Sequence, residues 1–483
     1  MSFARFVLED PAIPDSARQQ ALDRLHSDPG IPQATTTFSF WVQNPHPQFA
    51  QASSKPLPAS ADIVIIGSGI SAASIARTIL QSRTISASIP SHPTVVILEA
   101  RDICSGATGR NGGHIIETAD EYGELADAFG SEAARKIMRF RLSHLKEMLQ
   151  VAKELGLSEE AQARKVQFLS AYFGEKPWRE ALERLCRFKE GMPEESAEWI
   201  AYDTGSMPED FRLSNATGVV AGPAGAIWPY KFVTGVLANL VAEYPQEIQI
   251  SDRTAVESIQ TDSATNKYTV KTSRGEITAR HVIHCTNAHV AHLVPGLRGR
   301  VFLCEVKCQP KHLVTRGQMM LGRGFAQGEL GGIAELGVPG DDEMSVYIDI
   351  HLSGALSAVF GRESWGRVKG DQVQAMWTGN MGFSSDSFAW VGQLPDSLSS
   401  RPSLDKGNGA EWVCAAFGGE GMVQCWQSGK ALATMLGLKD KELGLNVPSD
   451  LSWFPEQMVV SQQRISAAEL PSSVAAFRRQ ANL

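Results

Sequence analysis

Short, continuously apolar runs separated by a helical stretch predict the first ordered part of the chain. Residues 61–66 (Ala-Asp-Ile-Val-Ile-Ile) and 94–98 (Thr-Val-Val-Ile-Leu) are rich in β-branched residues, which is typical of strands buried on both faces. Small and apolar residues follow the first run at helical density from 70 to 80. Strand, helix and strand in this order predict a right-handed βαβ unit, and therefore an α/β fold with a parallel sheet.

Beyond residue 120 the apolar positions change to helical spacing, and this pattern continues to residue 172. It predicts a helical insertion that leads into a second lobe. Strand patterns return in a hairpin over 267–285, and residues 412–416 predict a strand that enters a glycine-rich turn and then a helix over 422–435. The mixed pattern of 301–375 predicts no order of strands.

The first 60 residues have a different character from the rest of the chain. They are rich in Pro, Ser, Gln and Ala, and their one aromatic island is Phe38-Ser-Phe-Trp41. We expect an extended N-terminal arm that wraps the body of the molecule and docks through Phe38, Phe40 and Trp41.

Length and charge limit the classes of protein that remain. A chain of 483 residues exceeds the roughly 250–300 residues of a single hydrophobic core, so we expect two lobes. The 45 Lys and Arg against 53 Asp and Glu give a net charge of −8, without any basic block. This argues against nucleic acid or an anionic membrane surface as partner, and no apolar run approaches the ~20 residues that span a bilayer.

The cysteines are not arranged as a disulfide framework. They are odd in number and scattered, at Cys104, Cys186, Cys285, Cys304, Cys308, Cys414 and Cys425. The N-terminal sequence lacks the apolar stretch of a secretory signal, so a reducing intracellular compartment fits best. No second Cys or His pair lies at zinc-site spacing near Cys304 and Cys308, and we expect no metal.

A glycine-rich turn joins the first predicted strand to the helix after it. Its sequence is Gly67-Ser-Gly-Ile-Ser-Ala72, a GxGxxA pattern. Gly67 allows a tight turn, Gly69 lets the backbone approach a pyrophosphate, and Ala72 keeps the helix close to the sheet. The helix N-terminus supplies amide donors for the phosphates. The pattern predicts a dinucleotide site, although similar turns also occur for packing reasons alone.

Glu99 strengthens the nucleotide interpretation because it follows the second predicted strand directly. An acid at this point can bind the ribose hydroxyls. Its distance from the glycines is longer than the usual ~20 residues, and the polar loop 81–93 accounts for the excess. The alternative is a structural turn with an incidental glutamate.

The run after Glu99 distinguishes FAD from NAD and carries a family resemblance. It reads Ala100-Arg-Asp-Ile-Cys-Ser-Gly-Ala-Thr-Gly-Arg-Asn-Gly-Gly-His114. Its glycines and polar residues are unsuited to a hydrophobic core and well suited to a loop whose backbone N–H groups donate to a ligand. This segment resembles one in the D-amino-acid-oxidase-like superfamily of FAD-dependent oxidoreductases. It is most similar to the γ-glutamylputrescine oxidoreductase branch and its fungal relatives.

Four further stretches carry the same resemblance, which spans roughly residues 35–445 of the chain. They are Ala226-Ile-Trp-Pro-Tyr-Lys231, Thr254-Ala-Val256, Val282-Ile-His-Cys-Thr-Asn-Ala288, and the pair Trp377–Pro395 with Ala416-Phe-Gly-Gly-Glu-Gly-Met422. The family pattern breaks at Thr315-Arg-Gly-Gln-Met319, which comes late, and in 320–375, which lacks a recognisable substrate strand.

The resemblance implies a Rossmann-like FAD-binding domain combined with a discontinuous, mixed-sheet substrate domain, an α/β fold with an α+β second lobe. The FAD-binding domain is expected from 61–119, 226–300 and 376–445. The substrate domain is expected from 120–225 and 301–375, between an arm over 1–60 and a tail over 446–483.

The resemblance also implies which residues hold FAD. The expected residues are Gly67, Ser68, Gly69, Ile70, Ser71, Ala72, Glu99, Ala100, Arg101, Ser105, Gly106, Ala107, Thr108, Gly109, Asn111, Gly112, Gly113, Val256, Asn287, Ala288, Gly418, Gly419, Glu420, Gly421 and Met422. Ala375-Met-Trp-Thr378 stands where sarcosine-oxidase-like relatives carry the cysteine bonded to their flavin, so non-covalent FAD is expected. Gly418, Gly419 and Gly421 would place amide donors beside the flavin.

Catalytic side chains are harder to identify, because in this type of oxidase the flavin carries the chemistry. Arg110 and His114 are our candidates for catalytic groups near the isoalloxazine. The alternative is that they form a structural salt bridge or a hydrogen-bonded polar part of the core. Trp228 and Tyr230 are candidates for side chains that line the substrate site. The alternative is that both only pack in the protein interior. Lys307 or Lys311 could be an oxygen-activating lysine.

Together these features predict an FAD-dependent oxidoreductase that oxidises a C–N bond of a small amine or amino-acid-like substrate by hydride transfer to flavin N5, with O2 as acceptor. The alternatives are oxidation with cyclisation of a specialised metabolite, oxidation of a hydroxy acid, and a catalytically weak FAD-binding paralogue. We expect a cytoplasmic location, and the degenerate C-terminal Ala-Asn-Leu leaves the peroxisome as the alternative.

Overall fold

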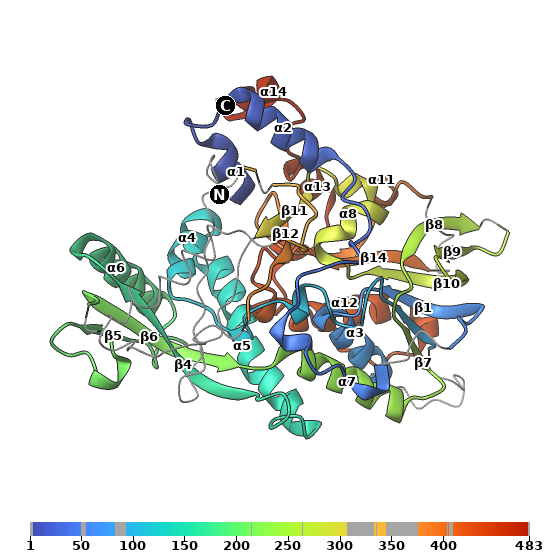
Figure 1. The fold of residues 1–483 in the computed structure, drawn as a ribbon, viewed down its shortest axis with the longest axis horizontal. Helices are drawn as coiled ribbons and strands as arrows, with labels where there is room; N and C mark the ends of the chain where they lie inside the picture. The colour runs from blue at the N-terminus through green and yellow to red at the C-terminus, as the bar shows by residue number, and fades with distance from the viewer. Residues whose placement is uncertain are drawn as a thin grey trace.

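The computed structural model describes residues 3–49, 55–82, 93–213, 215–262, 264–306, 333–334, 336–343, 375–402, 404 and 409–481. The expectations for Lys307, Lys311, Thr315–Met319 and most of 301–375 lie outside these residues. The described chain forms two sheets, a two-stranded ribbon and the helices that cover them (Figure 1).

The larger sheet has eight strands, with the order β13-β14-β10-β1-β2-β7 and the β8–β9 hairpin beside β10. Its strands are β1 (Ser60–Ile66), β2 (Val95–Leu98), β7 (Ile248–Ser251), β8 (Val256–Asp262), β9 (Lys267–Thr272), β10 (Gly275–His284), β13 (Trp390–Gln393) and β14 (Ala410–Ala415). β1 is parallel to both of its neighbours, β2 and β10. On the outer sides, β2 is parallel to β7 and β10 is parallel to β14. Ile63, Val64 and Ile65 have no exposed surface, which confirms a buried first strand.

Three helices cover this sheet, namely α3 (Ile70–Gln81), α7 (Pro229–Glu243) and α12 (Cys425–Lys439) (Figure 1). β1, α3 and β2 form the predicted βαβ unit. α3 packs against α12 where Gly429 faces Ser74, because a Cβ on Gly429 would lie 2.7 Å from the Cβ of Ser74. The small residues of α3 therefore allow two helices to lie close together above the sheet.

The second lobe is an antiparallel sheet covered by long helices (Figure 1). The strand order is β3-β6-β4, with β5 also paired to β6. The strands are β3 (His114–Ile115), β4 (Arg164–Tyr172), β5 (Ile200–Asp203) and β6 (Gly218–Ala226), and the helices are α4 (Asp120–Phe129), α5 (Ser131–Glu154) and α6 (Glu175–Gly191). The predicted helical insertion is present in α4 and α5, but the expected helical pattern up to residue 172 is wrong at its end. Residues 164–172 form β4, because all nine pair with β6.

The expectation of a wholly extended N-terminal arm is wrong. The segment begins with two helices, α1 (Phe3–Glu9) and α2 (Asp15–His26), and is extended only after them. Leu22 and Leu25 of α2 are buried at helical spacing in a cluster with Phe302 and Phe477, and this burial stabilises the helices. Of the aromatic island, Trp41 is buried and Phe40 partly buried, whereas Phe38 is 64% exposed.

Both ends of the described chain meet on one side of the molecule (Figure 1). α2 packs against α14 (Val474–Ala481), and Gln19 bonds the backbone of Ser472 and Val474. The ribbon β11 (Val301–Val306) and β12 (Gly379–Ser384) lies beneath them, and the remaining short helices are α8 (Val290–Leu293), α11 (Asp396–Ser399) and α13 (Gln462–Ala467). No helix in the described residues is both long and apolar enough to cross a membrane.

Candidate functional site

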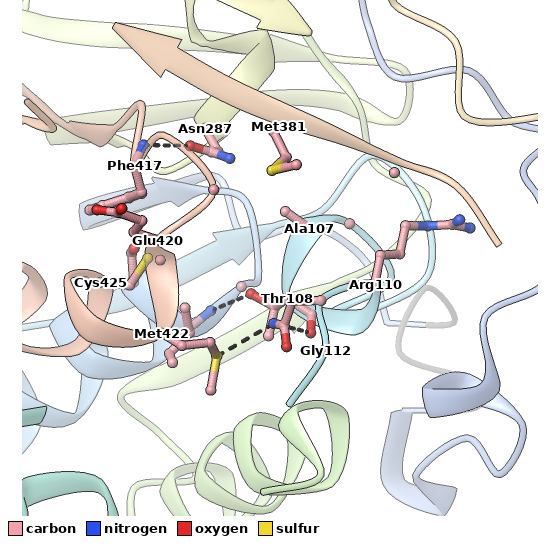
Figure 2. Close-up of a pocket in the computed structure, with 18 of the residues that line it drawn as sticks. Ala107, Thr108, Arg110, Gly112, Asn287, Met381, Phe417, Glu420, Met422 and Cys425 are labelled. Carbon is pink, nitrogen blue, oxygen red and sulfur yellow. Dashed lines mark hydrogen bonds between the residues drawn. The ribbon is translucent and has the colours of Figure 1, made fainter. Parts of the chain in front are cut away.

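A cavity of about 1090 Å³ opens at the carboxyl ends of β1, β2 and β10 (Figure 2). Its volume lies just above the ~300–1,000 Å³ of most small-molecule sites. The glycine-rich turn after β1 lines one part of it, and β4 of the second lobe lines another. Ligands of open parallel sheets bind at this edge of the sheet, so the position agrees with a nucleotide site.

The two glycines of the GxGxxA turn are required by close contacts. Gly67 has a φ of +103°, and a Cβ there would lie 2.7 Å from the carbonyl oxygen of Cys285. Gly69 precedes α3, and its Cβ would lie 2.9 Å from Oγ1 of Thr108. The first glycine therefore permits the turn against β10, and the second lets the loop around Thr108 approach the start of the helix.

Glu99 holds this turn in place at the end of β2. Its Oε2 accepts hydrogen bonds from the backbone N (3.0 Å) and Oγ (2.7 Å) of Ser68. Its Oε1 accepts one from the backbone N of Arg101 at 3.1 Å. The carboxylate also lines the cavity, so it can face a ligand while it orders the turn.

The glycine-rich loop after β2 is tied to both neighbouring parts of the cavity wall (Figure 2). Oγ1 of Thr108 accepts from the backbone N of Ile70 at 3.1 Å, at the first residue of α3. Nδ2 of Asn111 donates to the carbonyl of Thr108 at 3.0 Å and contacts Sδ of Met422 at 3.4 Å. The glycine-rich turn before α3, the loop after β2 and the loop at Met422 are thus joined by direct hydrogen bonds.

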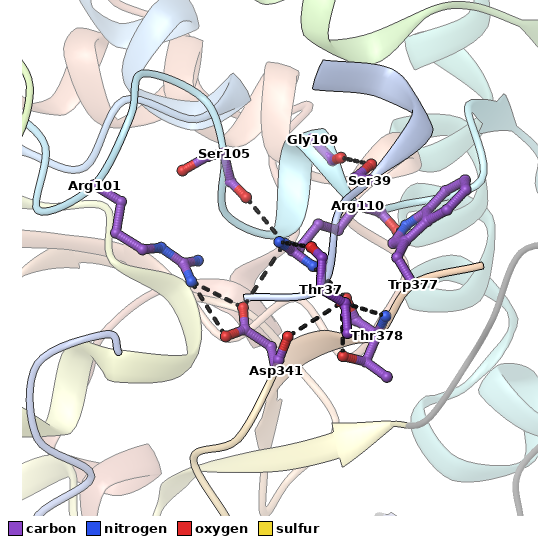
Figure 3. Close-up of polar contacts among 9 residues, drawn as sticks. All are labelled: Thr37, Ser39, Arg101, Ser105, Gly109, Arg110, Asp341, Trp377 and Thr378. Carbon is purple, nitrogen blue, oxygen red and sulfur yellow. Dashed lines mark hydrogen bonds and ion pairs between the residues drawn. The ribbon is translucent and has the colours of Figure 1, made fainter. Parts of the chain in front are cut away.

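Arg110 belongs to the cavity wall, but its guanidinium extends away from the cavity (Figures 2 and 3). It donates to the carbonyls of Ser105 (3.1 Å), Thr37 (2.6 Å) and Thr378 (2.7 Å), and to Oγ1 of Thr37 at 3.1 Å. Its Nε lies 3.7 Å from the carboxylate of Asp341. Burial lowers the pKa of Arg110 to about 10, so it remains cationic at neutral pH. This geometry favours the structural alternative for Arg110.

Asp341 joins Arg110 to Arg101 (Figure 3). Its carboxylate accepts two hydrogen bonds from Nη1 of Arg101, at 3.0 and 3.2 Å, and is 1% exposed. Its backbone carbonyl accepts from the backbone N of Thr37 at 2.8 Å. The sequence alone does not indicate Asp341 or Thr37, because nothing in the local pattern connects them to the glycine-rich loop.

His114, the second catalytic candidate, does line the cavity. Its Nδ1 is buried and has no hydrogen-bond partner in the described part of the chain. Burial, together with the positive charge of Arg164, lowers the pKa of His114 to about 4. His114 is therefore a neutral imidazole at physiological pH, available to a ligand as a donor or an acceptor.

A second loop completes the cavity between β14 and α12. Oδ1 of Asn287 accepts from the backbone N of Ala416 (3.0 Å) and of Phe417 (3.3 Å), as Figure 2 shows for Phe417. Ala416, Gly418 and Gly419 all have positive φ, at +66°, +61° and +82°. Asn287 fixes this turn, whose glycine-rich sequence suits its left-handed backbone.

Three carboxylates meet one arginine at the far side of this loop. Arg141 of α5 lies 3.3 Å from Glu117, 3.7 Å from Glu121 and 3.1 Å from Glu420. Burial and the neighbouring carboxylates raise the pKa of Glu117 to about 7 and also raise that of Glu121. Of these four residues, only Glu420 was predicted from the sequence to belong to the site. A charged residue at 141, among the apolar positions of a predicted helix, is the signal that could have revealed the cluster.

The remaining predicted residues divide clearly between the cavity and its surroundings. The cavity is lined by Gly67, Ser68, Gly69, Ile70, Ser71, Glu99, Ala100, Arg101, Gly106, Ala107, Thr108, Asn111, Gly112, Val256, Asn287, Ala288, Gly419, Glu420, Gly421 and Met422. The predicted residues behind this lining are Ala72, Ser105, Gly109, Gly113 and Gly418.

Trp228 and Tyr230 also lie outside the lining, within the packing between α7 and the N-terminal segment. Nε1 of Trp228 donates to the carbonyl of Trp41 at 2.7 Å, and its ring centroid lies 5.3 Å from those of Phe40 and Trp41. The hydroxyl of Tyr230 accepts from the backbone N of His46 at 3.1 Å. This geometry favours plain packing for both aromatics.

The residues of the cavity fit a flavin dinucleotide. Its glycine turns are built by close contacts, and Oγ1 of Thr286, Oδ1 of Asn380 and Nδ1 of His114 line it without partners among the described residues. Buried polar atoms of this kind need a partner from a ligand or water. No group of three or more His, Cys, Asp or Glu side chains suited to a metal ion occurs in the described ranges.

Comparisons with known proteins agree with this geometry. Residues 62–435 match the family described as FAD dependent oxidoreductase (DAO), whereas no curated protein matches the sequence. L-proline dehydrogenase from P. horikoshii is similar in structure, with a TM-score of 0.58 and 18% identity over 86% of this chain and 100% of that one. Glycine oxidase from Geobacillus kaustophilus has a TM-score of 0.54 and 17% identity over 79% and 96% of the two chains. The chain belongs to the DAO family of FAD-dependent oxidoreductase enzymes.

Proposed function

We propose that this enzyme oxidises a C–N bond of a small amine or amino-acid-like molecule, with O2 as the electron acceptor. One observation carries the proposal: a single cavity is lined both by the nucleotide-type turn at Gly67 and Gly69 and by β4 of the second lobe. A dinucleotide and a small substrate can therefore share one enclosed space. The similar solved structures support this chemistry, since they include a proline dehydrogenase, a glycine oxidase and an iminodiacetate oxidase.

The chain's own residues would hold FAD and exclude water from it. The start of α3 would offer backbone donors to the pyrophosphate, Glu99 would hold the ribose, and the loop at Asn287 and Gly419–Met422 would hold the isoalloxazine. When bound, FAD would supply the acceptor for a hydride from the carbon next to the substrate nitrogen, and the nitrogen would lose a proton to leave an imine. The imine product then takes up water to release a carbonyl compound, and O2 takes up the electrons as hydrogen peroxide. The predicted division into an FAD-binding domain (61–119, 226–300 and 376–445) and a substrate domain forms part of this proposal.

We propose further that FAD is held without a covalent bond. Residues 375–378, where covalent relatives carry a cysteine, contain none. Cys104, Cys285 and Cys425 do line the cavity, but burial raises the pKa of all three thiols. A protonated thiol is a poor nucleophile, so these cysteines are unsuited to forming a thioether with the flavin.

The purified holoenzyme tests the whole proposal. Acid precipitation should release the yellow cofactor into the supernatant as FAD, whereas flavin retained in the precipitate would contradict non-covalent binding. Anaerobic mixing with a panel of amines and hydroxy acids should bleach the flavin with amines alone. Bleaching by hydroxy acids, or by dithionite only, would exclude the proposed reaction. Readmitted air should restore the colour and form peroxide.

A further inference from the structure

The N-terminal segment between α2 and the aromatic island contributes to the wall of the cavity. We call residues 28–37 of this segment the strap. Three of its residues, Gly30, Ile31 and Pro32, line the cavity together with the loops that follow β1 and β2. None of the three belongs to a segment that the sequence predicts to hold FAD. This part of the cavity wall therefore has no assigned ligand.

The strap is fixed to the body of the protein on both sides of these three residues. Before them, Asp28 accepts a hydrogen bond from Nδ1 of His292 at 2.9 Å and pairs with Nη2 of Arg298 at 2.8 Å. After them, the backbone N of Thr37 donates to the carbonyl oxygen of Asp341 at 2.8 Å. The two attachments hold the intervening residues against the cavity.

The contacts of the strap place it at the ribose end of the cavity. The carbonyl oxygen of Gly30 accepts from Nδ1 of His289 at 3.1 Å. Burial lowers the pKa of His289 to about 4, and the nearby charges of Arg101 and Asp341 also act on it. The backbone N of Arg101 in turn donates to Glu99, the acid expected at the ribose. The strap therefore lies beside the part of the cavity where the adenosine half of FAD would bind.

Two histidines that contact the strap offer hydrogen-bond acceptors to a ligand. His289 and His292 both line the cavity. Their Nδ1 atoms contact a carbonyl oxygen and a carboxylate, and since neither oxygen can donate, Nδ1 carries the hydrogen in both rings. Nε2 is then the acceptor of each neutral ring, and that of His292 is buried without a partner in the described part of the chain. The adenosine half of FAD carries matching donors in its 6-amino group and ribose hydroxyls.

The strap also presents an apolar surface to the cavity. Ile31 is 39% exposed although it belongs to the cavity wall, and Pro32 follows it directly. An aromatic base that contacts these two side chains removes apolar surface of both partners from water, which favours binding. A phosphate or another charged group would gain nothing from such a surface, so the surface suits the adenine.

We propose that Gly30, Ile31 and Pro32 of the strap, together with His289 and His292, form the binding site for the adenosine half of FAD. The apolar side chains of the strap contact the base, and the two imidazoles accept hydrogen bonds from the adenosine. Asp28 is a positioning residue, because it is absent from the cavity wall and acts through the strap that it anchors. The inference goes beyond the proposed function, since it concerns the cofactor and is independent of the substrate.

The first test titrates the apoprotein with FAD, with ADP, which carries the adenosine half alone, and with FMN, which carries the flavin half alone. Fluorescence gives the dissociation constants of the two flavins, and calorimetry gives that of ADP. In Ile31→Ser the affinities for FAD and for ADP should each fall about tenfold, because the apolar contact with the base is lost. The affinity for FMN should not change. Ala34→Ser, at an exposed position of the strap outside the cavity wall, is the matched control.

The second test concerns the anchor. Asp28→Asn removes the charge that pairs with His292 and Arg298, so the strap is held less firmly. FAD should leave the diluted holoenzyme about tenfold faster, as the fluorescence of the released cofactor reports. The affinity for FMN should again stay unchanged. Asp23→Asn, at an exposed aspartate of α2, is the control and should release FAD at the rate of the wild type.

The outcomes decide the inference without any turnover. Unchanged affinities in Ile31→Ser, or a loss for FAD without a loss for ADP, would overturn the adenosine site. A loss that extends to FMN, or that appears equally in the control variants, would show a general loosening of the protein and would also overturn it. An unchanged release rate in Asp28→Asn would refute the anchor. Amine oxidation enters none of these measurements, so the adenosine site and the proposed reaction can fail separately.

Discussion

Nη1 of Arg110 donates to the carbonyl oxygen of Thr378 at 2.7 Å and so connects residues 268 positions apart in the sequence. The same guanidinium holds Thr37 of the N-terminal segment. Through its guanidinium, Arg110 thus joins three distant parts of the chain beside the cavity that it helps to line. Its role is to hold the glycine-rich loop in its conformation, and any effect on the flavin must pass through that loop.

Replacing Arg110 by Met should destabilise the protein and weaken FAD binding together. The change leaves three backbone carbonyls without their donor and Asp341 with one basic partner fewer, so the free energy of unfolding should fall by about 3–5 kcal/mol. Thermal midpoints of the holoenzyme and the FAD content after dialysis measure both effects. Arg179→Met, at an exposed position of α6, is the control. A stable variant that keeps FAD but has lost flavin reduction would instead indicate a catalytic role.

Gly67→Ala should remove FAD binding, whereas Gly156→Ala should not. Both glycines have positive φ, at +103° and +68°, so both substitutions cost roughly 1 kcal/mol of backbone strain. Only Gly67 adds an overlap, with the carbonyl oxygen of Cys285, while nothing lies within 4 Å of a Cβ on Gly156. Fluorescence titration of the apoprotein with FAD measures the difference. Equal affinities in the two variants would contradict a role of the close turn.

The raised pKa of Glu117 predicts how the stability of the protein without substrate depends on pH. The folded pKa of about 7 lies above the ordinary 4.5, so the folded state holds a proton that the unfolded state has lost between these values. The contribution of Glu117 is full below pH 4.5 and is lost as the pH rises through 7. Thermal midpoints between pH 5 and 8 should therefore fall less steeply in Glu117→Gln than in the wild type. Parallel curves would show that Glu117 has an ordinary pKa.

The lowered pKa of His114 predicts the opposite dependence at lower pH, where the stability of the protein should rise with pH. Its folded pKa of about 4 lies below the ordinary 6.5, so the unfolded state binds the additional proton between these values. The stability that the neutral ring contributes is present above pH 6.5 and is lost as the pH falls towards 4, on the order of 2 kcal/mol. His114→Asn should flatten this acid limb of the stability curve. The rate of flavin reduction should show no inflection between pH 7 and 9 that comes from His114. An inflection in the wild type that disappears in His114→Asn would show that His114 is not neutral over this range.

Local pattern was sufficient for the elements that repeat a simple periodicity. The buried strand Ile63–Ile66 and its partner at Val95–Leu98 carry their burial in their own composition, and the glycines between them report a close turn. The N-terminal helices were missed because their apolar positions are few. Leu22 and Leu25 become informative only through Phe302 and Phe477, which lie hundreds of residues away.

The same limit explains which site residues were found. Gly67, Thr108 and Asn287 belong to motifs in which neighbouring residues share one task, so the sequence indicates them together. Asp341 and Glu117 act through long-range contacts, Asp341 with Arg101 and Arg110 and Glu117 with Arg141. The local sequence around the two carboxylates does not show which residues they contact. Arg110 also belongs to such a motif, but the motif does not reveal that its guanidinium bonds Thr378 of a distant segment, and its role beside the flavin stays a prediction.

The hydrogen bond between the hydroxyls of Thr37 and Thr378 constrains the order in which the protein can be completed during synthesis. Thr37 leaves the ribosome 341 residues before its partner, and at ~5–20 residues per second the delay is of the order of tens of seconds. Until then the N-terminal segment can contact only residues that are already made, such as Gly109, whose carbonyl accepts from Oγ of Ser39. The N-terminal segment is therefore fixed to Thr378 only after the glycine-rich turn and the loop after β2 have long been made.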